Sequence, residues 1–495
     1  MKKNVKALCA LLAFLLSVLP LAACVPEDAD ETTGQSTTEG EETSASEKDL
    51  LEDALAELGD LAYWQGDFGI LYTNDFHGYD AEVEASADKG GETAAGIIND
   101  AVYERNTLFE EYCMLDFVTI PVTSEAATSR LQAEAQTATG DFQLVTMKTR
   151  DTAAAATTGV LFNYLDLDIE YERPWWDQGT LDFALEGRVF FMNGPFNMVD
   201  DNVTFVMMFN KDRYADYQVE NPYDTVARGD WTLSYFHEII SGLSAENGDG
   251  VWDEQDTYGF STPNSIGDTL FYGAGLRYVV NSPDMDTPEL VLDTKMEQAL
   301  SVLDIARAIV HEDHATYVAP SFYEDNAKNM FVQGRSLFYC EAANYLSALN
   351  AEMEDEYGVL PLPKYDENQA VYTTWIHSSG STLSIPTTVV RGDLELFENV
   401  LETYVLLSQK IVKPAYYDTM MTVRNVQDVE SSEMLDMIFA NRTYDMAIYF
   451  ESLGFANLFA SSVLSDADQF TSSYKAESKG FEKRVGLILR NLRDS

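Results

Sequence analysis

The stretch EGRVFFMNGPFNMVDDNVTFVMMFNK, from Glu186 to Lys211, places two apolar runs on either side of a chain breaker. The first run, Val189 to Met192, ends at Asn193-Gly194-Pro195, and the second, Val203 to Phe209, follows a polar spacer. Neither run alternates between apolar and polar residues, which is typical of strands buried on both faces. The breaker therefore predicts a hinge between two lobes, with the ligand site in the space beside it.

Length and charge limit the class of protein. A chain of 495 residues with 46% hydrophobic residues exceeds one ordinary core, which predicts two lobes. The formal net charge of -52 repels phosphate backbones and anionic headgroups, so neither nucleic acid nor electrostatic membrane binding is expected. We expect no local gathering of basic residues and therefore no strongly anionic substrate. No repeat recurs at a fixed period, which excludes solenoids and propellers.

The N-terminus has the pattern of an export signal. Three lysines precede an apolar run from Ala7 to Leu19, and Leu21-Ala22-Ala23-Cys24 follows. This last group is similar to the lipobox of bacterial lipoproteins, which implies that residues 1–23 are removed and Cys24 is acylated. The alternative is a single transmembrane anchor, but the run is too short to span a bilayer. We expect a lipid-anchored protein on the extracytoplasmic face of the cell membrane.

An acidic linker and a regular alternation follow. Residues 24–62 are rich in Glu, Asp, Thr and Ser and predict a disordered tether, although Leu51, Leu55 and Leu58 at helical spacing leave a short amphipathic helix open over 47–62. Beyond it the patterns predict, in order, a strand over 68–72, a helix over 97–112, a strand over 113–120, a helix over 125–139 and a strand over 142–147. Such alternation is typical of a largely parallel, doubly covered sheet, whose ligands bind beyond the carboxyl ends of the strands. The residues at these ends are Asp75, Phe76, His77, Lys148, Thr149 and Arg150.

The second half is mainly helical with short apolar runs between the helices. Thr232 is an expected N-cap for a helix that reaches about Leu243, and Trp231 is expected to pack beneath it. Further helices are predicted over 296–310, 341–354, 394–411 and 433–439, and short apolar runs lie at 336–339 and 382–385.

In this order the pieces resemble bacterial extracellular solute-binding proteins of family 1, the lipoproteins that feed ABC importers. The resemblance covers the chain beyond the tether, although Ala245 stands where the family often has Asp. Its most specific parts are Ile97 to Asn106, Arg173-Pro174-Trp175-Trp176-Asp177, Phe209-Asn210-Lys211, Asp230-Trp231-Thr232-Leu233, the loop from Asn247 to Gly259, and Pro414 to Asp418 leading to Glu433-Met434-Leu435-Asp436.

The resemblance implies an α/β, periplasmic-binding-protein-like fold of type II, with two α/β lobes, mostly parallel sheets and multiple hinge crossovers. By that analogy lobe 1 comprises residues 63–192 plus about 331–385, and lobe 2 comprises 193–330 plus about 386–495. The chain would cross out near Asn193, return near 331–339 and cross again near Ile385.

The implied function is non-enzymatic capture of a small solute, commonly a mono- or oligosaccharide, for the membrane permease subunits of an ABC importer. A monomer is expected. Two alternatives stay open: a surface-anchored glycoside hydrolase that uses two carboxylates, and a sensor subunit that binds solute for a signalling partner. Sugar binding calls for aromatic faces and for side chains that bind paired hydroxyls. The candidates at strand ends or at the hinge are Asp75, His77, Arg150, Asn193, Gly273, Gly275, Glu341, Trp375 and Tyr416.

Two further features bear on metals and redox chemistry. No cofactor is expected, but the loop from Asn247 to Asp256 has nearly the ligand spacing of a calcium loop. The alternative is a turn held by the loop's own Asx side chains. Cys113 and Cys340 lie beyond the signal and Cys24, and we expect two buried free thiols rather than a disulfide. His311 and His314 lack zinc-site spacing. The calcium candidates are Asn247, Asp249, Val251, Asp253 and Asp256.

Overall fold

The computed structural model describes the folded body of the chain. The described residues are 51, 54–56, 58, 63–75, 78, 80–217, 219–282, 285, 287–321, 324–421, 429–465 and 469–494. The signal, Cys24 and most of the predicted tether lie outside them, as does His77. The described end of the tether is ordered instead: Leu51 and Leu55 are helical, and Leu55 is buried in a core that includes residues of β1 (Gly66–Thr73) and α2 (Ala94–Cys113).

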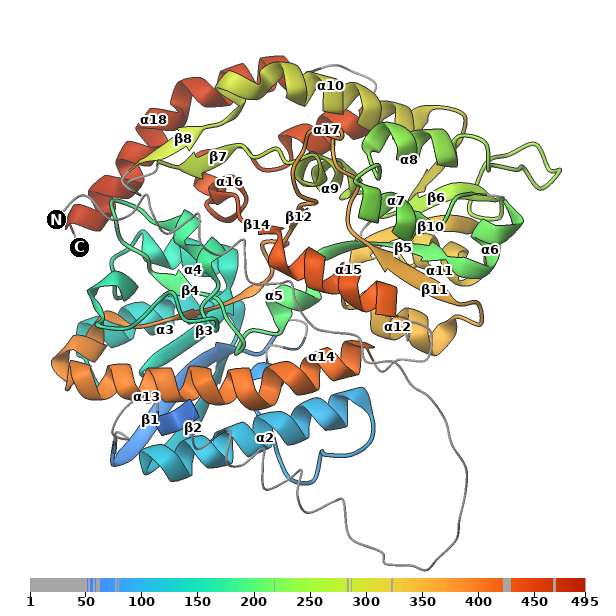
Figure 1. Ribbon diagram of the computed structural model, residues 1–495. Helices are drawn as coiled ribbons and strands as arrows, with labels where there is room; N and C mark the ends of the chain where they lie inside the picture. Colours follow the sequence, from blue (N-terminus) through green and yellow to red (C-terminus); the bar gives the residue numbers. More distant parts are fainter. Residues whose placement is uncertain are drawn as a thin grey trace, which may run out of the picture. The chain divides into compact units, whose positions relative to one another are not determined.

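The first sheet has the strand order β2-β1-β3-β13-β4 (Figure 1). The strand β1 pairs in parallel with β2 and β3, whereas β13 pairs antiparallel with β3 and β4. The chain alternates strand and helix through this region, as the sequence predicts. The bounds are β1 (Gly66–Thr73), α2 (Ala94–Cys113), β2 (Leu115–Val122), α3 (Ser124–Thr137), β3 (Leu144–Lys148), α4 (Thr149–Ala156), β4 (Phe191–Met192) and β13 (Ser381–Ser384).

Both faces of the first sheet are buried, because successive residues of a strand point to opposite faces. Along β1, Phe68, Ile70 and Tyr72 pack in a core that includes residues of α2 and of α13 (Leu394–Leu407). Leu71 enters the other core, which includes residues of α3 and α4. This double burial explains why β1 shows no alternation in the sequence.

The second sheet has the order β11-β5-β10-β6-β9. The strand β6 pairs in parallel with β9 and β10, and β5 pairs antiparallel with β10 and β11. All six residues of β5 are buried, as expected for the second apolar run. The bounds are β5 (Phe205–Asn210), β6 (Tyr258–Thr262), β9 (Thr316–Val318), β10 (Ser336–Ala342) and β11 (Tyr357–Leu360).

Helices cover both faces of this sheet too. Met207 and Phe209 face a core that includes residues of α8 and α10, and Val206 and Met208 face a core that includes α11, α12 and α15. The Trp231 side chain is fully buried, and its indole N–H donates to the carbonyl of Pro361 at 2.9 Å. The helices are α8 (Leu233–Ile240), α10 (Leu292–His311), α11 (Asn326–Val332), α12 (Tyr345–Glu352) and α15 (Val429–Ala440).

Further elements belong to the second lobe and to the crossovers. Thr232 caps α8 as predicted, because its hydroxyl accepts the N–H of Tyr235. The remaining elements used below are α9 (Ile266–Gly273), β7 (Val279–Asn281), β8 (Pro288–Leu290), β12 (Thr374–Trp375), β14 (Arg442–Thr443), α16 (Met446–Tyr449), a 3-10 turn at Glu451–Leu453, α17 (Leu458–Leu464) and α18 (Phe470–Asp494).

Within the described chain, three segments cross between the lobes. The first leads from β4 through α5 (Val199–Asn202) to β5, where the sequence places it. The second leads from β11 through β12 to β13. In the third, α13 continues through a π-helical turn, Ser408–Val412, into α14 (Lys413–Met421), and α15 then packs on β11. The strand β14 pairs with β12, which joins the end of the chain to the second crossover.

Strand pairing corrects the predicted later crossings. The expected return near residues 331–339 falls on α11 and β10, and β10 pairs with β5 and β6 inside the second sheet. The expected third crossing near Ile385 falls before α13, whose Phe397 and Leu401 pack in the core of the first lobe. An apolar run predicts a buried strand but does not say which sheet will pair with it.

The same pairing separates the two cysteines. Cys113 ends α2 in the first lobe and Cys340 lies on β10 in the second, and both are buried free thiols, as expected. Among the described helices, none has the length and apolar character needed to span a membrane.

Candidate ligand-binding site

One pocket joins the two lobes at their crossovers. It has a volume of about 290 Å³. The first lobe contributes the loop after β1 and the first turns of α2, the second contributes the loop after β10 and α12, and the crossovers contribute α5 and α14. The lining residues are Gly78, Ala81, Ala94, Ala95, Ile98, Met198, Asn202, Ala343, Asn344, Leu346, Ser347, Asn350, Tyr416, Thr419 and Met420.

Asn202 holds the pocket walls together. Its carbonyl accepts the N–H of Asn344 at 2.9 Å, which ties the loop after β10 to the first crossover. Its side-chain Oδ1 accepts the hydroxyl of Tyr416 at 2.8 Å, which ties α14 to the same point. These bonds fix residues of the second lobe and of two crossovers relative to one another. The wall of α2 belongs to the first lobe, so a solute in the pocket touches both lobes.

The pocket has the chemistry of a site for an uncharged polar ligand. Among the described residues that line it, none carries a charged side chain, and Asn202, Asn344, Ser347, Asn350, Tyr416 and Thr419 carry amides or hydroxyls. Asn350 is 8% exposed, and its Nδ2 has no hydrogen-bond partner among the described residues. A buried donor left unpaired costs roughly 1–3 kcal/mol. Protein atoms cover the Nδ2 in this conformation, so a ligand hydroxyl accepts this hydrogen bond only once the Asn350 side chain turns toward the pocket.

A buried group of charges holds the crossovers beside the pocket. Arg442 on β14 donates to Asp177 at 2.7 Å, to Asp200 at 3.2 Å and also to Asp201. Lys413, the first residue of α14, pairs with Asp201. The side chains of Asp200 and Asp201 are each 2% exposed and that of Arg442 is 11% exposed. One guanidinium therefore links the first lobe, the first crossover and the strand that pairs with the second crossover.

Tyr416 is the predicted ligand-binding residue that lines the pocket. Trp375 does not line it: the side chain is 3% exposed, and its ring stacks on Phe205 with centroids 4.7 Å apart and on Tyr272 at 5.5 Å. Its indole N–H donates to Thr269 at 3.3 Å. The large flat face that favours sugar stacking is here occupied by two core aromatics.

Two predicted residues take part in contacts at the first-lobe edge. Asp75 accepts the N–H and the hydroxyl of Ser124, at the start of α3. Burial raises the pKa of Asp75, but the bonds from Ser124, its own backbone N–H and the charge of Lys148 together lower the pKa below its ordinary value. Arg150, at the start of α4, lies 3.8 Å from Glu451 with a side chain 44% exposed. Neither lines the pocket, and their role as ligand contacts stays a prediction.

Asn193, Gly273 and Gly275 lie in structural positions. Asn193 is 1% exposed, and its amide donates to Asp200 at 3.3 Å, inside the buried group of charges. The carbonyl of Gly273 accepts from the side chain of Gln369 at 2.9 Å, and Gly275 has a φ of +68°, which favours glycine just after a helix. His77 lies outside the described residues.

Glu341 is buried on β10. It is 2% exposed, its Oε1 accepts the N–H of Ala342 at 2.8 Å, and burial raises its pKa to about 8, against an ordinary value of 4.5. The folded protein therefore binds this proton more tightly than the unfolded chain. The stability that depends on the protonated carboxyl is complete below about pH 4.5 and is lost as the pH rises through about 8.

We therefore expect Glu341→Gln to be more stable than the wild type at alkaline pH and to differ little at acidic pH. One pKa unit corresponds to about 1.4 kcal/mol, so the difference above the folded pKa should reach roughly a few kcal/mol. Urea unfolding of both proteins across this pH range measures it, and other buried carboxyls cancel in the comparison. A stability difference that is independent of pH would show that Glu341 does not titrate as described.

The calcium-like loop is held by its own side chains. Asp256 accepts the N–H of Asn247 and the N–H of Asp253, both at 2.8 Å. Asp249 accepts the N–H of Val251 at 2.8 Å in an Asx turn. No group of three or more His, Cys, Asp or Glu that could hold a metal occurs in the described part of the chain. The loop thus has the Asx-turn geometry that the sequence left open as the alternative.

Sequence reasoning missed the amides of the pocket. Asn344 follows the apolar run of β10, so the rule that selected other strand ends applies to it as well. It was missed because the predicted helix began at residue 341, whereas β10 extends to Ala342 and α12 begins at Tyr345. Asn350 lies on the same helix. Asn202 lies within the spacer between the two apolar runs, and no local pattern distinguishes it from the other polar residues there.

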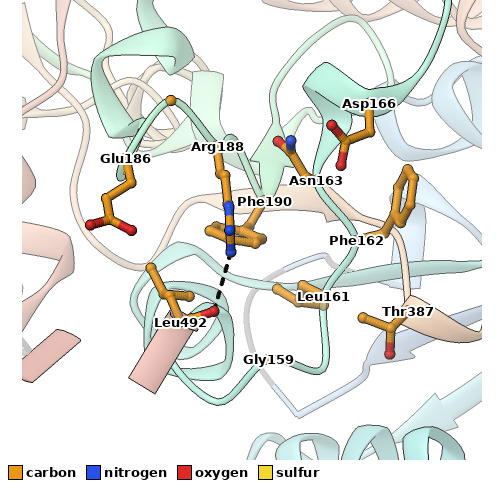
Figure 2. A pocket seen from close by; sticks show the side chains of 11 residues that line it. Gly159, Leu161, Phe162, Asn163, Asp166, Glu186, Arg188, Phe190, Thr387 and Leu492 are labelled. Atoms are coloured by element: carbon orange, nitrogen blue, oxygen red, sulfur yellow. Dashed lines mark hydrogen bonds between the residues drawn. The ribbon is translucent and has the colours of Figure 1, made fainter. Parts of the chain in front are cut away.

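A larger hollow, of about 450 Å³, lies beside the end of α18 (Figure 2). Arg188 reaches across it and donates to the carbonyl of Leu492 at 3.2 Å. Its lining also includes Asp166 and Glu186. Apart from Leu492 of α18, its described lining comes from the first lobe, and no crossover contributes to it.

Comparisons with solved structures show the same fold. An ABC substrate-binding protein from Listeria monocytogenes in complex with cycloalternan is 12% identical with a TM-score of 0.52, over 85% of this chain and 99% of that chain. A cyclo/maltodextrin-binding protein complexed with maltotetraose is 11% identical with a TM-score of 0.52, over 86% and 96%. UgpB from Mycobacterium tuberculosis in complex with glycerophosphocholine is 16% identical with a TM-score of 0.51, over 78% and 95%.

At such identities the likeness concerns the fold. It confirms the predicted architecture of two α/β lobes joined by several crossovers, the type II periplasmic-binding-protein-like fold. No protein-family model matches the chain, and no curated protein sequence matches it.

Proposed function

We propose that this protein captures a small uncharged solute, of the mono- or oligosaccharide class, between its two lobes and delivers it to an ABC importer. The observation that carries the proposal is the pocket lined by both lobes and two crossovers, without a charged side chain among its described lining residues. Its volume is at the small end of the roughly 300–1,000 Å³ of small-molecule sites, which fits a short saccharide. Two of the structurally similar proteins are complexes with oligosaccharides.

The mechanism follows from the position of the pocket. A solute bound to one lobe gains further contacts with the other only when the lobes close, so it stabilises the closed form by the difference in affinity. The three crossovers restrict that motion to rotation about the region of α5, β12 and the π-helical turn. The closed form then docks on the permease subunits, while Cys24 holds the protein to the membrane on its extracytoplasmic face.

The same pocket favours a receptor over a hydrolase. A glycosidase needs two carboxyl groups that flank the scissile bond. No Asp or Glu occurs among the described residues that line the pocket. The carboxylates of Asp200 and Asp201, which precede the lining residue Asn202 in the chain, are already engaged by Arg442 and Lys413. Incubation with the bound sugar separates the two functions, because a hydrolase would consume it.

We expect a screen of neutral mono- and oligosaccharides to raise the unfolding temperature. A ligand at about 100 times its Kd adds roughly 2.7 kcal/mol of stability. Asn350→Leu should then weaken binding of the sugar found by about tenfold, because the apolar side chain cannot donate to a ligand hydroxyl. Calorimetric titration measures the loss.

The matched control is Asn329→Leu on α11, a residue of the same lobe that does not line the pocket. It should bind the sugar like the wild type. Equal affinities for wild type and Asn350→Leu would place the solute elsewhere. Charged solutes, glycerophosphocholine among them, should leave the unfolding temperature unchanged.

A further inference from the structure

The last helix, α18, differs in charge from the rest of the molecule. It carries six basic and three acidic residues, a formal charge of +3, whereas the whole chain has a charge of -52. The expectation that basic residues are not gathered locally is therefore wrong for this helix. The spacing of Lys475, Lys479 and Lys483 at every fourth position places them along one side of the helix, and Arg490 falls on the same side.

The opposite side of α18 is fixed to the second lobe by apolar contacts. Phe470 packs edge-on against Phe459 of α17 with centroids 5.3 Å apart, and Phe481 packs against Phe455 at 5.8 Å. The hydroxyl of Tyr474 donates to Asp293 of α10 at 2.8 Å. In Figure 1 the helix runs beside α10 and β8. The buried residues thus orient α18, and its basic side faces outward.

The outward side forms a stripe of four exposed cations, Lys475, Lys479, Lys483 and Arg490, with the exposed Glu482 at its edge. None of the four is in an ion pair with another residue of the described chain. Leu487, beside them, is 45% exposed. By contrast Arg484 turns inward, pairs with Glu477 at 3.0 Å and lies over the ring of Phe455. The five basic side chains of α18 that the structure describes thus divide into an internal one, Arg484, and four that face outward.

We propose that this stripe is a docking surface for anionic phospholipid headgroups. A row of cations with an exposed leucine at its edge matches a negatively charged, partly apolar interface. The Debye length is about 8 Å at physiological ionic strength, and a helix with its side chains is about 10 Å across. Headgroups in contact with the stripe are therefore largely screened from the acidic body behind it, so the net charge of the chain does not decide the interaction.

The choice of a membrane as partner rests on the anchoring that is part of the proposed function, since an acylated Cys24 keeps the body near headgroups. Contact through α18 would orient the tethered body on the membrane. Binding of the stripe to headgroups does not require the acyl chain on Cys24. A chain that carries Cys24→Ser therefore tests the stripe without the lipid anchor.

The test is cosedimentation of this full-length Cys24→Ser chain with vesicles of phosphatidylcholine, with and without about one third of phosphatidylglycerol. We expect binding to the phosphatidylglycerol vesicles only, and at least a tenfold weaker affinity when the salt rises from about 0.05 M to about 0.5 M. Absence of binding, or equal binding to both vesicles, overturns the proposal and leaves solute capture and lipid anchoring untouched.

A pair of charge-matched variants locates the surface. Replacement of Lys475, Lys479, Lys483 and Arg490 by Gln should weaken binding about tenfold or more. The control replaces Lys89, Arg213, Arg228 and Lys410 by Gln, which changes the net charge equally at other places and should keep most of the affinity. Equal losses in both variants overturn the assignment to α18. Thermal melting of both, expected to match the wild type, shows that the helix still packs.

Discussion

Ala95→Trp is expected to abolish solute binding while the protein stays folded. Ala95 lies in the first turn of α2, lines the pocket and is exposed, so a larger side chain meets no packed core. An indole would fill much of a pocket of about 290 Å³ and would separate α2 from α12. We expect the affinity to fall by at least about a hundredfold, equivalent to roughly 2.7 kcal/mol. Calorimetric titration with the sugar found in the screen measures the loss.

The control for this prediction is Ala133→Trp. Ala133 is an exposed residue of α3, a helix of the same lobe, and it does not line the pocket. The free energy of unfolding of both variants should lie within about 0.5 kcal/mol of the wild-type value, as is usual for surface substitutions. Retained affinity in Ala95→Trp would mean that the solute does not use this pocket, and the proposed function would lose the observation on which it depends.

Arg442→Ala is expected to destabilise the protein by about 3–5 kcal/mol, the usual result of removing one partner from a buried ionic group. The guanidinium contacts three carboxylates, and the side chains of Asp200 and Asp201 are each 2% exposed. Without Arg442, the cation that remains in this group among the described residues is Lys413. It pairs with Asp201 alone. Asp200, 2% exposed, and Asp177, 19% exposed, then lack their cation, and at Asp200 water does not replace it. Urea unfolding measures the loss.

Arg228→Ala provides the comparison. Arg228 also pairs with two carboxylates, Glu220 at 2.9 Å and Asp230 at 3.0 Å, but its side chain is 47% exposed. Exposed ion pairs contribute about 0–1 kcal/mol, so the loss should be several times smaller. Equal losses in the two variants would show that burial of the Arg442 group does not determine its contribution. If Arg442→Ala loses stability but keeps its affinity for the solute, the buried group of charges stabilises the fold without contributing to solute binding.

Local patterns predicted the first lobe well because its elements alternate along the chain. The strand β1 pairs with β2 and β3, the next two strands in sequence, so neighbours in the sequence are neighbours in the sheet. The second lobe was predicted less well for the opposite reason. The partners of β10 are β5 and β6, which lie far upstream, and an apolar run does not identify a distant partner. The basic stripe of α18 could have been predicted, since its lysines repeat at every fourth residue.

The candidate site, too, was predicted from the sequence only in part. Tyr416 was predicted and lines the pocket, but Trp375, an equally plausible aromatic, stacks on Phe205 and Tyr272 inside the core. Composition does not tell a ring that meets a sugar from a ring that meets another ring. The amides of Asn202, Asn344 and Asn350 are polar residues like many others until strands and crossovers bring them to one cavity.

The sequence by itself determined the strands β1, β2 and β3, the helices α2 and α3 and the first crossover, because these depend on residue spacing and on chain breakers. It also contained the basic periodicity of the last helix. Only the tertiary structure decided to which sheet β10 and β11 belong, which aromatics are core, and that amides from distant segments line one uncharged pocket. The physical reason is that burial and pairing depend on what faces a side chain, and for these residues the partner comes from a remote part of the chain.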